Sequence, residues 1–228
     1  MVLEKLSMNK RGFFFIIMAM ILISFFLVSY TFFSVVRDQS AVQRRVETLN
    51  NFVFAAEEDM QRRVFISGFR VLFLFEKNIV DSGDPISSFD STVDELFYNG
   101  TLYGNSVPLI MDDAKYSDLE NLLSEKANKI GANLTLSNPI FSITQEDPWN
   151  VKVQLTTDFI LEDLTGLASW NTTITSISYI PIDNFGDPIY YVNTNSLVFG
   201  NITRSPYTDF VSGTNVSNLY SHALGSFY

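Results

Sequence analysis

The longest apolar run in the chain lies near its start. Phe13 to Val36 form 24 consecutive positions without a charge, and about 20 apolar residues span the hydrocarbon core of a bilayer. A secretory signal has an apolar region of roughly 7–15 residues that ends in a small-residue cleavage site, whereas Arg37, Asp38 and Gln39 follow this run. The length also argues against a helix buried in a soluble core. The pattern therefore predicts a transmembrane helix over residues 13–36.

Beyond this run the pattern becomes amphipathic. From Arg37 to Val80 there is no proline, and the only glycine is Gly68. Apolar residues recur with a period close to 3.5, at Val42, Val46, Leu49, Val53, Ala56 and Met60. Such a stripe suits packing against another helix, and it suits equally well a helix that covers the protein's own globular domain. We predict a helical continuation over residues 37–80 and leave both alternatives open.

The last part of the predicted helix is apolar on nearly every side. Val64 to Phe75 is interrupted only by Gly68 and Arg70. This segment is too short to cross a bilayer, so we expect the globular domain or neighbouring subunits to surround it. Gly83 and Pro85 then predict the end of the helix. A helix from residue 13 to residue 80 would be roughly 100 Å long.

The chain from residue 85 to residue 200 predicts a small α+β domain outside the membrane. Ser88 is expected to cap a first short helix, and Ser117 with Glu120 forms a capping-box pattern for a second helix that ends at Gly131. Residues 132–144, 149–161 and 170–182 are rich in β-branched residues or alternate between apolar and polar positions, which predicts an antiparallel meander. The chain after Val192 is polar, and we expect an edge strand at residues 196–199 and an irregular tail over residues 201–228.

Charge is distributed unevenly along the chain. The whole sequence has a formal net charge of −10, which divides into +3 for residues 1–80 and −13 for residues 81–228. Lys5, Lys10 and Arg11 precede the apolar run, so the positive-inside rule places the N-terminus in the cytoplasm and the C-terminal domain outside. A basic leader over residues 1–12 therefore stays cytoplasmic. An acidic outer domain is a poor partner for nucleic acid, so we expect none.

Candidate chemistry in the outer domain is sparse. There is no cysteine and a single histidine, His222, and we find no catalytic motif. Carboxylate pairs at Asp112/Asp113, Glu146/Asp147 and Glu162/Asp163 fit turns or a solvated surface, with calcium binding as a weaker alternative. The sequence predicts no catalytic activity, no cofactor and no metal site. Five Asn-x-Ser/Thr sequons lie beyond the apolar run and are candidate glycosylation sites, at Asn99, Asn133, Asn171, Asn201 and Asn215.

The residues Lys10, Arg11 and Gly12 ahead of the apolar run resemble the class III signal of archaeal type IV pilins and archaellins. In that family a peptidase cuts after the glycine, which makes Phe13 the implied mature N-terminus here. The resemblance extends to the architecture, with an apolar helix, an amphipathic continuation and a β-rich outer domain. Many members have glutamate at the fifth mature position, where this chain has Ile17.

These observations lead to a prediction of a structural role. We expect a pilin-like subunit, or a minor component, of an archaeal cell-surface filament that assembles through the N-terminal helix with copies of itself or with other pilin-like subunits. Before assembly the partner of that helix is membrane lipid. The alternatives are a single-span membrane-anchored module for binding or adhesion, and an envelope enzyme whose site has no recognised motif.

Overall fold

The computed structural model describes residues 10–204, with no side-chain description for residues 10–12 and 38. Its longest element is a single helix, α1 (Lys10–Ser82). The chain forms two compact units, one ending at Asn50 and one beginning at Asn51. The elements of the second unit that follow α1 are α2 (Phe89–Asp94), η1 (Glu95–Asn99), β1 (Thr101–Leu102), β2 (Asn105–Ser106), α3 (Pro108–Met111), α4 (Tyr116–Lys129), β3 (Ala132–Asp147), β4 (Asn150–Asp163), β5 (Ser169–Pro181) and α5 (Pro188–Thr194).

The continuous helix predicted from the sequence is confirmed, and so is its end. Because no proline occurs before Pro85, nothing interrupts the backbone hydrogen-bond ladder of α1. After Ser82, Gly83 adopts φ 73°, and its amide donates to the carbonyl of Ile79 at 2.8 Å. This is the left-handed helix end that glycine favours.

The three long strands form an antiparallel meander in the order β3-β4-β5, as predicted. Along β4, buried residues alternate with half-buried or exposed ones, so one face of the sheet is covered and the other is open. The register pairs Leu134 of β3 with Leu161 of β4. A bulge between Ser137 and Ile140 interrupts the β3–β4 pairing. Turns at residues 148–149 and 164–167 connect the strands where the sequence predicted them.

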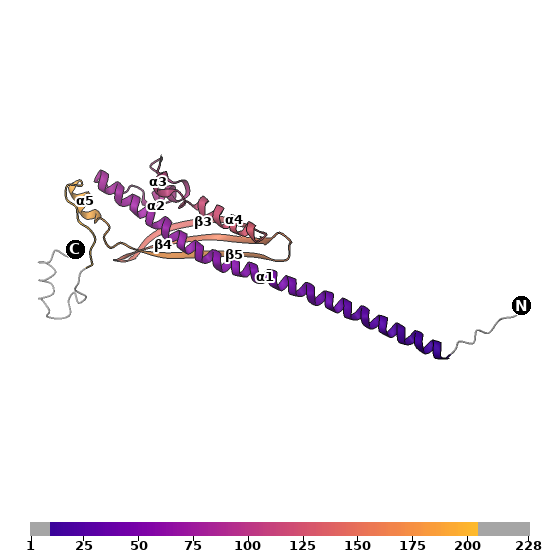
Figure 1. Cartoon of the computed structure of the whole chain (residues 1–228). Coiled ribbons are helices and arrows are strands. Elements are labelled where there is room, and N and C mark those ends of the chain that lie inside the picture. Colours follow the sequence, from indigo (N-terminus) through magenta and orange to yellow (C-terminus); the bar gives the residue numbers. More distant parts are fainter. Residues whose placement is uncertain (1–9, 205–228) are drawn as a thin grey trace, which may run out of the picture. The chain divides into compact units, whose positions relative to one another are not determined.

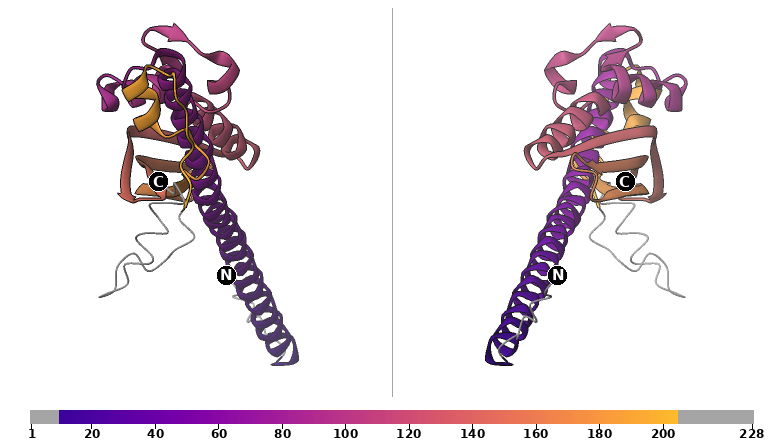
Figure 2. Two further views of the ribbon diagram at one scale, coloured as in Figure 1. Left: turned by 90° about the vertical axis from the view of Figure 1, so that its left-hand side faces the viewer. Right: turned by 90° about the vertical axis from the view of Figure 1, so that its right-hand side faces the viewer.

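Two helices cover the buried face of this sheet. Figures 1 and 2 show α4 and the later part of α1 lying next to each other over β3, β4 and β5. An ion pair between Lys126 of α4 and Asp59 of α1 joins the two helices. The π-helix η1 adds Phe97, whose ring stacks on Phe141 of β3 with centroids 3.8 Å apart. The second unit is therefore an α+β domain built around one end of a long helix.

Two local predictions were wrong. Residues 196–199 form no strand. The element that precedes them is the short helix α5. Its start is stabilised by the Asp187 carboxylate, which accepts the Ile189 amide at 2.9 Å, and by Pro188 in the first turn. The prediction that Ser88 caps the first short helix is confirmed, because Ser88 is the N-cap of α2. Its backbone carbonyl accepts the Thr92 amide at 3.0 Å, and its side chain makes no cap bond.

The second error concerns the start of α4. The N-cap is Lys115 and the helix begins at Tyr116, two residues earlier than a capping box of Ser117 with Glu120 requires. The Asp118 carboxylate accepts the Lys115 amide at 3.2 Å, and this contact closes the first turn instead. The hairpin β1–β2 and the single turn α3 were not predicted, because each is too short to produce a periodic pattern.

Candidate functional site

The most unusual surface of the described chain is the apolar part of α1 in the first unit. Between Phe13 and Val36 the large apolar side chains are 40–74% exposed. Within residues 10–204, α1 is the one helix that is long and apolar enough to cross a membrane. An uncovered apolar surface of this size is unfavourable in water, so this part of the helix is suited to a lipid environment.

The predicted signal residues lie at the start of this helix. The backbone of Lys10, Arg11 and Gly12 is helical, and the side chains of Lys10 and Arg11 are outside the described part. Phe13, the implied mature N-terminus, is 51% exposed. The backbone alone neither favours nor disfavours a cleavage site at Gly12.

The amphipathic stripe changes its burial along the helix. Val42 and Val46 are each 37% exposed. The remaining members, Leu49, Val53, Ala56 and Met60, are buried. Next to this buried stretch, the carbonyl of Gln61 accepts a hydrogen bond from the Ser178 hydroxyl of β5 at 2.8 Å.

Further along α1, basic side chains hold a loop whose backbone carbonyls would otherwise lack partners. Arg63 donates to the carbonyl of Asp113 at 2.8 Å, and Arg70 donates to the carbonyl of Ile110 at 2.9 Å and to that of Asp112. The Ser67 hydroxyl donates to the carbonyl of Ala114 at 2.6 Å. These contacts attach residues 110–114 to α1. Sequence reasoning missed them because the accepting groups belong to the backbone and have no sequence signal.

A close approach between α1 and the sheet was also missed. A Cβ atom on Gly68 would lie 2.5 Å from Cγ2 of Val153 and 2.9 Å from Cδ1 of Ile180. Glycine is therefore needed where the helix crosses β4 and β5. An isolated glycine inside an apolar helix is the signal that could have pointed to this crossing.

Four of the five sequons lie in the described part of the chain, and the asparagine of each is exposed: Asn99, Asn133, Asn171 and Asn201. Asn133 pairs with Glu162 and Asn171 pairs with Ile160. Because Ile160 and Glu162 are two positions apart on β4, both asparagines lie on the open face of the sheet at the same end. Asn215 is outside the described residues, as is His222.

The predicted carboxylate pairs have different local roles. Asp163 is the last residue of β4 and is buried, and its carboxylate accepts from the Thr165 hydroxyl and the Leu167 amide of the following turn. Glu146 forms an ion pair with Lys152 at 2.8 Å. Asp112 and Asp113 are exposed, and their carbonyls accept from α1. Among the described residues, no group of three or more potential metal ligands converges.

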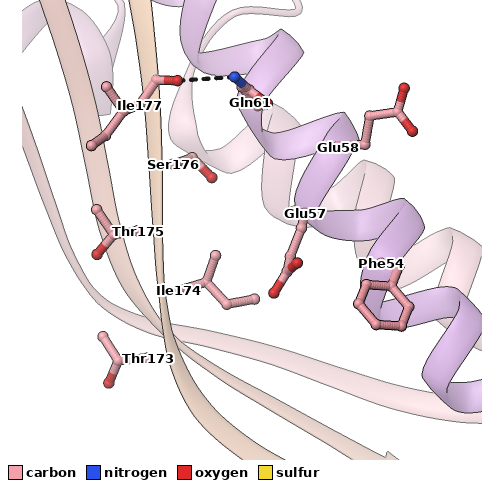
Figure 3. A pocket seen from close by; sticks show the side chains of 9 residues that line it. All are labelled: Phe54, Glu57, Glu58, Gln61, Thr173, Ile174, Thr175, Ser176 and Ile177. Atoms are coloured by element: carbon pink, nitrogen blue, oxygen red, sulfur yellow. Dashed lines mark hydrogen bonds between the residues drawn. The ribbon is translucent and has the colours of Figure 1, made fainter.

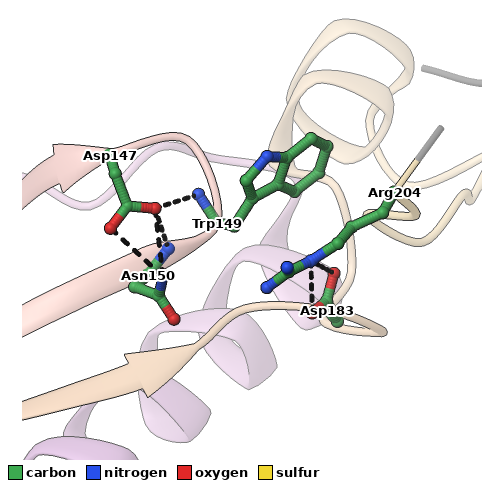
Figure 4. Close-up of polar contacts among 5 residues, drawn as sticks. All are labelled: Asp147, Trp149, Asn150, Asp183 and Arg204. Atoms are coloured by element: carbon green, nitrogen blue, oxygen red, sulfur yellow. Dashed lines mark hydrogen bonds and ion pairs between the residues drawn. The ribbon is translucent and has the colours of Figure 1, made fainter. Parts of the chain in front are cut away.

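Asp147 belongs to a polar cluster at the end of the sheet (Figure 4). Its carboxylate accepts the Trp149 amide at 2.7 Å and the Asn150 amide at 2.9 Å, and these bonds, that of Trp149 first, lower the pKa of Asp147. The Arg204 guanidinium lies 5.4 Å from the centre of the Trp149 ring and pairs with Asp183 at 2.9 Å. The cluster holds Arg204 beside the turn between β3 and β4.

Comparison with known protein families, curated proteins and solved structures finds no match for this chain.

Proposed function

We propose that this protein is a structural subunit, or a minor component, of a cell-surface filament, with a pilin-like architecture. In the membrane, lipid covers the apolar part of α1. On assembly the same surface exchanges lipid for the helices of neighbouring subunits, and the acidic second unit faces water. The leader stays in the cytoplasm, and cleavage after Gly12 releases Phe13 as the mature N-terminus.

One observation carries this proposal: the apolar surface of the first unit is longer than an anchor needs. The uncharged run over residues 13–36 corresponds to roughly 36 Å of helix, which by itself spans a bilayer core of about 30 Å. Val42 and Val46 continue the exposed apolar surface beyond the uncharged run. An apolar stripe with a period near 3.5 that extends past the membrane favours contact with other helices.

Exposed sequons are consistent with an extracellular second unit, since glycans attach to surface asparagines. The alternative is a single-span anchored module that stays monomeric in the bilayer. This anchored module would need the transmembrane part of α1, but it would give no role to the exposed side chains of Val42 and Val46.

The experiment compares two aspartate substitutions on the same turns of α1. Val46→Asp places a charge on the apolar stripe, whereas Ser40→Asp places the same charge roughly 120° away around the helix, outside the stripe. We expect Val46→Asp to abolish filaments seen by negative-stain microscopy while the chain remains in the membrane, and Ser40→Asp to leave them intact. Mass spectrometry should show Phe13 at the mature N-terminus. A monomeric chain with an intact leader and no fibres would support the anchored module instead.

A further inference from the structure

The two edges of the three-stranded sheet differ in how they are protected. The β3 edge is interrupted by a bulge between Ser137 and Ile140 and contains Pro139, whose carbonyl accepts the Tyr98 hydroxyl at 2.8 Å. Such features prevent an edge from pairing with another strand. β5 forms the other edge, since it pairs with β4 alone. Its pairing has no bulge and it contains no charged residue, so this edge is suited to accept a further strand.

The backbone of β5 presents hydrogen-bonding groups along this edge. The amide of Ile182 donates to the carbonyl of Trp149 at 3.0 Å, which continues the pairing of β5 with β4. Because the direction alternates along a strand, the odd-numbered residues from 173 to 179 direct their backbone groups away from β4. The Gln61 side chain donates to one of them, the carbonyl of Ile177, at 3.2 Å. Among the described residues this is the one hydrogen bond that reaches these groups.

A groove runs along this edge between β5 and α1 (Figure 3). It consists of two adjoining hollows with volumes of about 580 and 610 Å³. We call it the β5 groove, and its lining residues are Phe54, Glu57, Glu58, Gln61, Arg62, Phe65 and residues 173–179. The side chains of Phe54 and Phe65 are 61% and 39% exposed. The groove thus offers backbone groups on one wall and apolar rings on the other, which is the arrangement that binds an extended peptide.

The α1 wall of the β5 groove is acidic. Glu57 and Glu58 are exposed, and Figure 3 shows the Glu57 side chain on the side of α1 that faces β5. Glu57 has no hydrogen bond or ion pair within residues 10–204. Glu58 lies 3.9 Å from Arg62, and both of these side chains are largely exposed, so this pair is weak. A lysine or arginine in the groove would therefore find a carboxylate ready to pair with it.

The same carboxylates argue against a second copy of this chain as the occupant of the groove. Two copies paired through β5 would bring Glu57 and Glu58 of both copies into one interface. β5 has no lysine or arginine that could offset these charges. Because like charges at an interface oppose association, the complementary partner is a basic segment of a different protein.

We propose that the β5 groove binds an extended, basic segment of another protein, which joins the sheet as a fourth strand. The backbone of this segment pairs with the odd-numbered residues of β5 and displaces the Gln61 amide from the Ile177 carbonyl. Every second side chain of the segment faces α1, where basic residues meet Glu57 and Glu58 and apolar ones meet Phe54. The proposal does not rest on the filament function, because its residues all belong to the second unit.

A synthetic peptide tests the proposal on the whole chain in nonionic detergent micelles. The probe is Thr-Val-Thr-Lys-Thr-Lys-Thr-Val-Thr, which places valines and lysines on one face of a strand. Hydrogen exchange followed by mass spectrometry should show about tenfold slower exchange of the edge-facing amides of residues 173–179 when the probe is bound, because they gain backbone partners. Peptides from β4 should be unchanged.

Two control peptides separate strand addition from simple charge attraction. The probe with glutamate in place of lysine should give no protection of residues 173–179. The probe methylated on its backbone nitrogens keeps both lysines but cannot donate to β5, so it should also give no protection. Protection by the methylated probe equal to that by the probe itself would overturn the proposal.

Variants of the chain test the role of the acidic wall. Glu57→Gln with Glu58→Gln should weaken binding of the labelled probe about fivefold to tenfold, measured by fluorescence anisotropy, because two exposed ion pairs are lost. Asp112→Asn with Asp113→Asn removes the same charge from an exposed loop and should leave the affinity unchanged. Equal weakening by both pairs would contradict the proposal. So would protection of residues 173–179 without the probe, whether constant or rising with protein concentration, because the chain itself or a second copy would then cover the edge.

Discussion

At the scale of single residues, the carboxylates of the second unit act mainly as acceptors that close turns and join strands. Asp158 joins all three long strands, because it lies on β4 and accepts from the Asn138 amide group of β3 at 2.8 Å and from the Thr173 hydroxyl of β5 at 2.9 Å. These bonds, that of Asn138 first, lower the pKa of Asp158 below 3.8. Asn138 has φ 50° at the bulge of β3, so the contact also fixes an unusual backbone conformation.

The position of Asp158 leads to a prediction about acid stability. A carboxyl whose pKa is lower when folded stabilises the protein above its unfolded pKa, and that contribution is lost as the pH falls through the lower folded pKa. Asp158→Asn should therefore lower the melting temperature at pH 7, and the difference from the natural chain should shrink below pH 3.8. Thermal melts followed by circular dichroism measure this. Asp84→Asn is the control, since the Asp84 carboxylate has no hydrogen bond among the described residues, and a constant difference at all pH values would contradict the prediction.

Single residues were the least predictable part of the sequence. Gly83 and Gly131 were predicted as helix ends, and both have positive φ, because glycine is strongly preferred there. Ser117 was assigned as the side-chain cap of α4 and is not, because the helix begins earlier, at Tyr116, and the Asp118 carboxylate accepts the Lys115 amide instead. The partners of Asp158 lie 20 and 15 positions away in sequence, where no local pattern indicates them.

At the scale of elements, apolar periodicity identified α1, α4 and the three long strands, because each is long enough to repeat its pattern several times. It failed at α5, where a proline and a capping aspartate start one short helix. It also gave no indication of how closely α1 approaches the sheet. That distance depends on which residues meet at the crossing, and these come from three separate elements.

Gly68 provides a test of this crossing. Gly68→Ala should lower the free energy of unfolding by about 1–3 kcal/mol, because its Cβ overlaps Val153 and Ile180; the gain in helix propensity of about 1 kcal/mol offsets only part of this loss. Urea denaturation measures the change. Adding Val153→Ala removes the methyl groups closest to the new Cβ, so the double variant should lose less than the sum of the two single losses. Strictly additive losses would show that the overlap is not the cause.

At the scale of the whole molecule, the sequence separates two kinds of surface along one chain. The apolar side chains of residues 13–36 are exposed in the first unit, and the second unit holds most of the negative charge. This separation could be predicted because it depends on composition alone. The groove between α1 and β5 (Figure 3) could not be predicted, because it arises where two elements more than 100 residues apart in sequence meet.

Removing residues 1–36 tests whether membrane attachment resides in the apolar run alone. We expect the shortened chain to appear in the aqueous fraction after cell disruption, because the remaining surface is acidic and carries no further apolar span within the described residues. Its circular dichroism melt should match that of the second unit in the whole chain, since the core of that unit is formed by residues from Asn51 onward. Removing residues 1–12 is the control and should leave the protein in the membrane fraction. If the chain without residues 1–36 still sedimented with membranes, the second unit would have to contain a membrane contact of its own, and lipid could no longer be assigned to α1 alone.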